Sequence, residues 1–253
     1  MLAQIDEEDY FDGTGSLGNP EGYLSQASGY RARSGFMVEW MQKLCRLQGG
    51  RWLDVGCGPG FLVEAASKAG YDACGLDVSK TAVKFGRENL GLNLEVGHAE
   101  NLPECISGSF DVITLFDGLF HVRDPRMVLN YVHAALKSGG ALFAGPFDLH
   151  PPDWKPPTVI RNIESLGIPE HVSFVNQTSM EFLLNELEFQ DLRFLPMPEA
   201  PSTVLTQRFG MAPPWLMGIL RKLVRRVGFF LHRAASRVVN RKAGCVFATK
   251  AGF

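Results

Sequence analysis

Two carboxylates and three closely spaced glycines between residues 54 and 77 have the spacing of a ligand-binding turn. Asp54 precedes glycines at positions 56, 58 and 60, and Asp77 follows about 20 residues later. Glycines let a ligand approach the backbone closely, and a helix that begins at such a turn directs free N–H groups at the ligand. A carboxylate at the end of the next strand can bind both hydroxyls of a ribose. The pattern therefore predicts a nucleoside site in which Asp54 meets a positively charged group.

These residues need a strand, a turn, a helix and a second strand to bring them together, and the apolar pattern predicts each of them. The apolar run over 52–55 is typical of a strand that is buried on both faces. Apolar residues recur at helical spacing over 61–69, and Gly70 is expected to end that helix. A second apolar strand over 73–76 then ends on Asp77.

The glycine spacing separates two classes of nucleotide site. A dinucleotide site requires G-x-G-x-x-G, whereas this chain has G-x-G-x-G, with Phe61 at the position that the dinucleotide pattern needs. L-D-V-G-C-G-P-G at 53–60, followed by G-L-D-V-S at 75–79, resembles the class I S-adenosylmethionine (SAM) dependent methyltransferases. The resemblance covers residues 50–148 well and the rest loosely. It implies an α/β fold: a Rossmann-like, seven-stranded, mostly parallel sheet with helices on both faces and an antiparallel last strand.

The resemblance also implies SAM as the cofactor and S-adenosylhomocysteine (SAH) as its product. It assigns the methionine part of SAM to Asp54 and the glycines, and the ribose to Asp77. The family commonly has Asp-Ala after the third strand, where this chain has His98-Ala99. A neutral imidazole can accept the same hydrogen bond from the adenine amino group. The complete predicted cofactor site is Asp54, Gly56, Cys57, Gly58, Gly60, Phe61, Asp77, Val78, His98, Ala99, Glu100 and Phe116.

Residues that follow the fourth expected strand supply the candidate catalytic groups. Methyl transfer is an in-line displacement that depends on alignment in a dry pocket, and a hydroxyl acceptor often needs a general base as well. His121 is the candidate base, with Asp117 four residues earlier, and the family commonly has Glu-His where this chain has Phe120-His121. The alternative is a core or capping role for His121, and His150 and His171 are weaker candidates for the base. The sequence shows no metal-binding constellation.

The remaining elements follow from apolar periodicity and from capping residues. Ser79 and Asp124 are expected helix N-caps, and Pro125 suits the first helical position. Residues 136–140 resemble the L-K-P-G-G turn of the family, with Ser138 in place of proline. The expected helices cover 36–47, 61–69, 81–90, 125–136 and 179–187, and the expected strands cover 52–55, 73–77, 92–96, 110–116, 141–144, 189–195 and 244–250.

We predict one methyltransferase-like domain over residues 1–253. Its expected parts are an N-terminal lid or helical segment (1–48), a cofactor-binding core (49–195), a basic helical insertion (196–243) and the last strand (244–253). In related methyltransferases an N-terminal segment often lies over the SAM pocket. By that resemblance, the methionine carboxylate would meet one of Tyr23, Tyr30, Arg31 and Arg33. The alternative is a surface arm that its aromatic residues attach to the body.

Charge is distributed unevenly along the chain. The formal net charge is −2, but the residues from Ala200 onward include ten Lys or Arg and no Asp or Glu. Residues 215–240 follow the pattern of a long, basic, amphipathic helix, which predicts either peripheral contact with a membrane surface or packing on the domain or on a second subunit, as in a homodimer. No nucleic-acid-binding module accompanies the charge, so nucleic acid is not an expected partner.

The sequence predicts a cytoplasmic protein. If residues 215–240 contact a membrane, that contact is expected at the inner membrane face. The N-terminus lacks the apolar stretch of a signal peptide, and no run of about 18 apolar residues could span a membrane. The five cysteines are scattered, which favours reduced thiols over a disulfide framework or a zinc site.

The predicted function is SAM-dependent methyl transfer to a small-molecule acceptor or one linked to a lipid or glycan carrier, at oxygen, in a biosynthetic pathway. Residues 171–194 resemble a bacterial subgroup that acts on surface polysaccharides or small molecules, with Glu188 in place of the usual glycine. Two alternatives stay open from the sequence. One is a non-catalytic module that binds SAM or a nucleotide, and the other is an NAD-dependent oxidoreductase, which the missing G-x-G-x-x-G disfavours.

Overall fold

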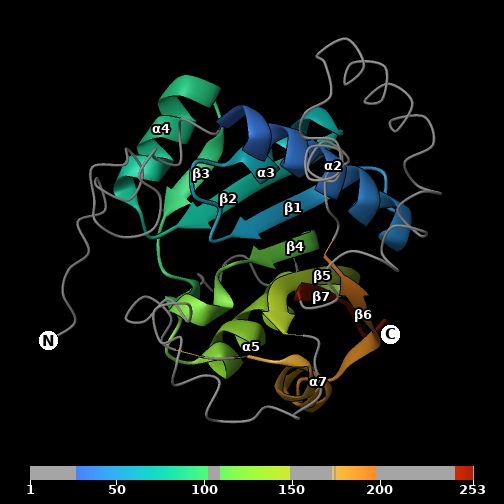
Figure 1. The fold of residues 1–253 in the computed structure, drawn as a ribbon. Coiled ribbons are helices and arrows are strands. Elements are labelled where there is room, and N and C mark those ends of the chain that lie inside the picture. The colour runs from blue at the N-terminus through green and yellow to red at the C-terminus, as the bar shows by residue number, and fades with distance from the viewer. Residues whose placement is uncertain (1–26, 102–108, 149–172, 174, 198–242, 253) are drawn as a thin grey trace, which may run out of the picture.

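The computed structural model describes residues 27–101, 109–148, 173, 175–197 and 243–252 (Figure 1). The strands are β1 (Gly50–Val55), β2 (Tyr71–Asp77), β3 (Asn93–Val96), β4 (Phe110–Phe116), β5 (Leu136–Asp148), β6 (Phe189–Pro196) and β7 (Ala243–Lys250). The helices are α2 (Ala27–Cys45), α3 (Phe61–Lys68), α4 (Lys80–Leu90), α5 (Pro125–Ala135) and α7 (Gln177–Glu186), with short 3-10 turns η2 (Ala99–Asn101) and η4 (Leu119–His121).

All seven of these strands form one sheet in the order β3-β2-β1-β4-β5-β7-β6. The pairs from β3 to β5 are parallel, and β7 is antiparallel to both β5 and β6. The predicted Rossmann-like sheet with an antiparallel last strand is therefore confirmed. The direction of the strand order reverses between β1 and β4, and open parallel sheets bind ligands outside the carboxyl ends of their strands at such a point.

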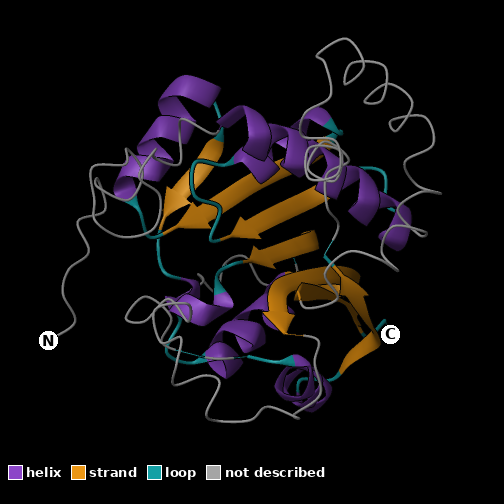
Figure 2. Ribbon diagram, viewed as in Figure 1, coloured by secondary structure: helices purple, strands orange, loops and turns teal. Residues whose placement is uncertain are grey.

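Helices cover both faces of the sheet, as Figure 2 shows, and each face has its own apolar core. On one face, α5 and α7 contribute Val128, Leu129 and Leu184 to a cluster with Leu53 of β1. On the other face, α2, α3 and α4 pack on a cluster that contains Trp52 of β1. Adjacent residues of β1 thus point to opposite cores, which explains its unbroken apolar run.

Two predicted caps position the helices beside the carboxyl ends of the strands. The Ser79 hydroxyl accepts a hydrogen bond from the Ala82 amide at 3.2 Å, and Asp124 Oδ1 accepts one from the Met127 amide at 3.0 Å. Such caps satisfy amides that have no partner inside the helix, and each contributes about 1 kcal/mol. The cap of α7 is Asn176, which lies upstream of the expected start of that helix.

The largest differences between the structure and the sequence prediction lie at the starts of α2 and β5. Helix α2 begins at Ala27 rather than at residue 36, so its first turns lie in a segment that lacks an apolar stripe. Strand β5 begins at Leu136 rather than at 141, because Leu136 already pairs with Phe110 before the register shifts and Ala141 pairs with Val112. Gly139, with a φ of 74°, allows the irregular backbone at this shift.

Strands β6 and β7 extend slightly beyond the predicted segment limits, to Pro196 and from Ala243. Most of the basic insertion, the N-terminal arm with Tyr23, and both His150 and His171 lie outside the described residues, so the proposals made for them stay predictions. None of the helices in the described ranges combines the length and the hydrophobicity needed to cross a bilayer.

Candidate functional site

A cavity of about 620 Å³ opens at the carboxyl ends of β1, β2 and β4, where the strand order reverses. Helix α2 contributes a further wall. The predicted site residues that line the cavity are Asp54, Gly56, Cys57, Gly58, Phe61, Asp77, Val78, His98, Ala99, Glu100, Phe116, Asp117 and His121. These residues come from β1, α3, β2, η2, β4 and η4 and from the loops beside them. The fold thus brings them to one cavity, whose volume is in the range of small-molecule sites.

Gly60 is the predicted site residue that does not belong to this lining. It precedes α3 with a φ of 85°, and a Cβ there would lie 2.7 Å from Leu92 Cδ1. Gly60 therefore allows the turn to enter α3 against the side chains of Leu92 and Leu94, a structural requirement of the glycine-rich turn.

Asp77 holds the glycine-rich turn in place. Its Oδ2 accepts a hydrogen bond from the Gly58 amide at 2.7 Å, and its Oδ1 accepts one from the Ser79 amide at 2.9 Å. The amides of Gly56 and Cys57 both donate to the Leu76 carbonyl at the end of the same strand. A carboxylate has about four lone-pair sites, so Asp77 can bind ligand hydroxyls while it keeps both of these bonds.

Asp54 lines the cavity with a carboxylate, although only 4% of its surface is exposed. Its Oδ1 accepts a hydrogen bond from the Thr114 hydroxyl at 2.7 Å. Burial raises the pKa of Asp54 to about 7; the Thr114 hydrogen bond opposes this rise and the negative charge of Asp77 adds to it. A cation that enters the cavity would favour the ionised form of Asp54.

Cys57 lines the cavity with an uncharged thiol that interacts with both carboxylates. Burial first, and then the charges of Asp54 and Asp77, hold the pKa of its thiol well above the ordinary value. A thiol of that kind packs as a small apolar group and is a poor nucleophile.

Helix α2 packs against α3 and forms one wall of the cavity. The Tyr30 ring stacks on Phe61 with 6.2 Å between ring centroids and 9° between ring planes. Arg31 pairs with Glu64 of α3 at 2.7 Å, with its guanidinium 5.6 Å from the centre of the Phe61 ring. Tyr30 and Arg33 line the cavity, whereas Arg31 does not belong to the lining.

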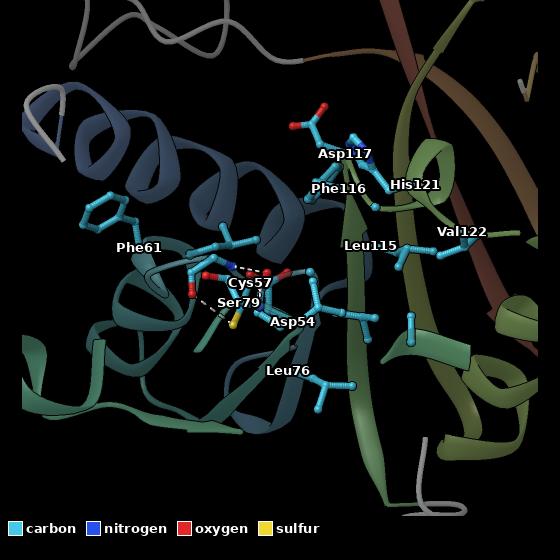
Figure 3. A pocket seen from close by; sticks show the side chains of 18 of the residues that line it. Asp54, Cys57, Phe61, Leu76, Ser79, Leu115, Phe116, Asp117, His121 and Val122 are labelled. Atoms are coloured by element: carbon cyan, nitrogen blue, oxygen red, sulfur yellow. Dashed lines mark hydrogen bonds between the residues drawn. The ribbon is translucent and has the colours of Figure 1, made fainter. Parts of the chain in front are cut away.

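Asp117 and His121 form the other side of the cavity, after β4. Figure 3 shows their side chains close together, apart from Asp54, Cys57 and Ser79. Asp117 has a φ of 58°, and its amide donates to the Gly145 carbonyl at 2.7 Å. This left-handed conformation, which aspartate adopts more readily than most residues, turns the chain from β4 into η4.

Two polar residues, Ser173 and Glu100, hold the turn that carries His121 through four hydrogen bonds. Ser173 donates through its hydroxyl to the Leu119 carbonyl at 2.5 Å and through its amide to the Phe120 carbonyl at 3.1 Å. Glu100 Oε1 accepts hydrogen bonds from the amides of Arg123 and Asp124 at 2.9 and 3.4 Å. Glu100 thus links the loop after β3 to the turn after β4.

The sequence analysis missed the support behind Asp54 and part of the α2 wall. Thr114 and Trp52 form the buried support, and Ser34 and Met37 belong to the wall. The available signal for Thr114 was a hydroxyl in the middle of the apolar run 110–116. Within the described ranges no cluster of three or more His, Cys, Asp or Glu side chains could hold a metal ion.

Comparison with known proteins gives matches that cover this region. The family model described as "Methyltransferase domain" matches residues 30–193. The ubiquinone biosynthesis O-methyltransferase of Bordetella avium is 37% identical over 120 residues, which are 45% of this chain and 50% of that protein. The protein of the same name from Pseudomonas aeruginosa (strain UCBPP-PA14) is 33% identical over 119 residues, 45% and 51% of the two chains. This chain therefore spans about half the length of the curated relatives that it matches.

Solved structures share the fold at low sequence identity. A SAM-dependent methyltransferase from Thermotoga maritima has a TM-score of 0.55 and 17% identity, with 90% of this chain and 96% of that chain covered. Phosphoethanolamine N-methyltransferase 2 of Haemonchus contortus, in complex with SAM, has a TM-score of 0.60 and 16% identity, with 98% and 57% covered. These similarities establish the shared fold.

Proposed function

The chain belongs to the methyltransferase-domain family, and we propose that it transfers a methyl group from SAM to an oxygen atom of a small-molecule or carrier-linked acceptor in a biosynthetic pathway. The predicted family is confirmed, and the bacterial subgroup stays a prediction. Similarity to O-methyltransferases of ubiquinone biosynthesis supports an oxygen acceptor and a biosynthetic role. Family membership favours this activity over the NAD-dependent oxidoreductase.

One observation carries the proposal: a nearly buried carboxylate, Asp54, lines a cavity beside a glycine-rich turn that Asp77 holds. The residues fit SAM, because its cations, an ammonium and a sulfonium, would compensate the charge of Asp54 and its ribose would meet Asp77. When bound, SAM supplies an electrophilic methyl group on a sulfonium.

The residues of this chain would bind SAM along the whole cavity. Asp54 binds the ammonium and Asp77 the ribose hydroxyls. His98 accepts from the adenine amino group through a neutral ring nitrogen. On α2, Arg33 meets the methionine carboxylate, and Tyr30 holds the helix on Phe61.

His121 is the proposed general base. It lines the cavity from η4, a turn that Ser173 and Glu100 hold through the backbone. An acceptor hydroxyl that hydrogen-bonds to its imidazole would transfer its proton there as the oxygen bonds to the methyl carbon, the carbon–sulfur bond breaks and SAH leaves. Asp117 would orient that ring, and the walls of the cavity would exclude water and align the reacting atoms. The sequence-based alternative, a core or capping role for His121, predicts that its replacement weakens folding rather than methyl transfer.

Calorimetric titration with SAH tests the cofactor site. We expect wild-type protein to bind SAH, Asp77→Ala to lose binding, and Asp72→Ala to keep it. Asp72 is a matched control because it lies on the same strand, with 78% of its side chain exposed and a long ion pair of 3.6 Å with Arg51. A parallel titration with NAD tests the oxidoreductase alternative. Absence of SAH binding by the folded wild-type protein would refute the proposed function.

A further inference from the structure

A buried hydrogen-bond chain runs behind Asp54, from β1 to β4 and back. The Trp52 indole Nε1 donates to the Thr114 hydroxyl at 3.0 Å, and Thr114 donates to Asp54 Oδ1 at 2.7 Å. Trp52 and Thr114 are fully buried. Strands β1 and β4 pair in parallel with Asp54 opposite Thr114, so the sheet register fixes this contact.

The donors and acceptors give the chain one direction. An indole N–H can only donate, so it uses a lone pair of the Thr114 hydroxyl and leaves the hydroxyl proton for another acceptor. The two acceptors in reach are Asp54 Oδ1 at 2.7 Å and the Leu53 carbonyl at 3.4 Å. The shorter bond, to a carboxylate, is the stronger one. The hydrogen bond from Trp52 therefore favours the orientation in which the Thr114 hydroxyl donates its proton to Asp54.

We propose that Thr114, held by Trp52, is a positioning residue that orients the Asp54 carboxylate toward the cationic methionine end of SAM and stabilises its charge there. Thr114 is not itself part of the cavity lining, so it acts through its hydrogen bond to Asp54. The inference rests on the proposed function, because it concerns the ligand that Asp54 binds.

Burial, and after it the charge of Asp77, favour the neutral form of Asp54. Asp77 at the end of β2 repels a second negative charge, and burial has the same effect on the pKa of Asp54. The thiols of Cys57 and Cys74 also interact with Asp54, and burial raises the pKa of both, so they stay neutral. Arg33 of α2 lines the same cavity and is the cation on that wall. Within the strands behind Asp54, Thr114 is the contact that lowers the pKa of this carboxyl.

The pH dependence of SAH affinity tests the proposal. We would titrate wild type, Thr114→Val and Thr114→Ser with SAH by calorimetry between about pH 5.5 and 8.5, across the pKa of Asp54. Valine keeps the shape of threonine and removes the donor, whereas serine keeps the hydroxyl. We expect Thr114→Val to move the midpoint of the pH dependence upward by about one pH unit, and so to weaken binding about fivefold at pH 7 and about tenfold below pH 6. Thr114→Ser should restore the wild-type profile.

Two further variants separate this role from a general effect on packing. Trp52→Phe removes the indole N–H but keeps Thr114, and we expect a smaller shift in the same direction because the hydroxyl can then turn to the Leu53 carbonyl. Thr249→Val is the matched control, because the Thr249 hydroxyl donates to the Gln190 carbonyl in β6, away from the cavity. It should leave the profile unchanged.

The outcomes are distinguishable. If wild type does not bind SAH, the proposed function fails. If wild type binds and Thr114→Val has the wild-type pH midpoint, or loses the same factor of affinity at every pH, the positioning role is overturned while the function stands. Should Thr114→Val fail to fold, the comparison of wild type with Trp52→Phe decides: an unchanged midpoint overturns the proposal, and an upward shift supports it.

Discussion

Replacing Asp54 by asparagine should stabilise the folded protein at neutral pH while it removes SAH binding. Asparagine has nearly the shape of aspartate and its side-chain oxygen can still accept from Thr114. The change therefore removes the charge and little else from a side chain that is 4% exposed. The cavity thus contains a charge that binding requires and that folding disfavours.

The magnitude follows from the pKa of Asp54, which burial raises from 3.8 to about 7. Between these values the folded protein binds more protons than the unfolded chain, so stability is greatest below about pH 4 and is lost as pH rises through about 7. One pKa unit corresponds to about 1.4 kcal/mol, so ionised Asp54 lowers the free energy of unfolding by about 4 kcal/mol above pH 7. The free energy of unfolding of Asp54→Asn should therefore exceed that of wild type by about 4 kcal/mol near pH 8.

Urea unfolding of both proteins at several pH values between about 4 and 8 measures this difference. The difference in free energy of unfolding between Asp54→Asn and wild type should increase as pH rises and should be nearly constant above the pKa of Asp54. Asp72→Asn, at an exposed position of β2, should show no such pH-dependent gap. A gap that does not change with pH, or a wild type more stable than Asp54→Asn near pH 8, would refute the reasoning.

Three further predictions concern the surrounding fold. Gly86→Ala places a Cβ 2.6 Å from a backbone oxygen of the glycine-rich turn and should lower the free energy of unfolding in urea by about 1–3 kcal/mol. Gly29→Ala in α2 meets open space and should raise that free energy by about 0.5–1 kcal/mol. Equal effects of the two changes would contradict this prediction. Burial lowers the pKa of His133, so the unfolded chain takes up this proton first and the free energy of unfolding decreases as pH falls below about 6.5. His133→Gln should make this decrease smaller. An unchanged slope of unfolding free energy against pH would count against the prediction. Glu100→Leu should speed amide hydrogen exchange at residues 123–124 about tenfold, and Glu100→Gln should not; equal rates in both variants would disprove the link between the two loops.

Local sequence signals were sufficient for much of the sheet and for the turn between Asp54 and Asp77. Apolar runs predicted buried parallel strands, because both faces of β1 and β4 lie under helices. Ser79 and Asp124 predicted helix starts because a cap bonds to an amide only a few residues away. Features of this kind depend on neighbours in the chain and are therefore visible without the fold.

The start of α2 could not be predicted from local signals. Residues 27–35 have two glycines and no apolar stripe, so periodicity placed the helix start at residue 36. Contacts of Tyr30 with Phe61 and of Arg31 with Glu64 join these turns to α3 across more than thirty residues. Tertiary packing outweighs local propensity there, as it commonly does.

By itself, the sequence determined the family, the fold class and the carboxylates and glycines that line the cavity, because their meaning lies in residue type and short spacing. Only the tertiary structure decided that Arg33 lines the cavity while Arg31 does not, and that Glu100 holds the His121 turn. It also decided that Thr114 and Trp52 stand behind Asp54, since the register of β1 against β4 brings together residues about sixty positions apart. Which hydroxyl meets which carboxylate depends on that register, and no local pattern encodes it.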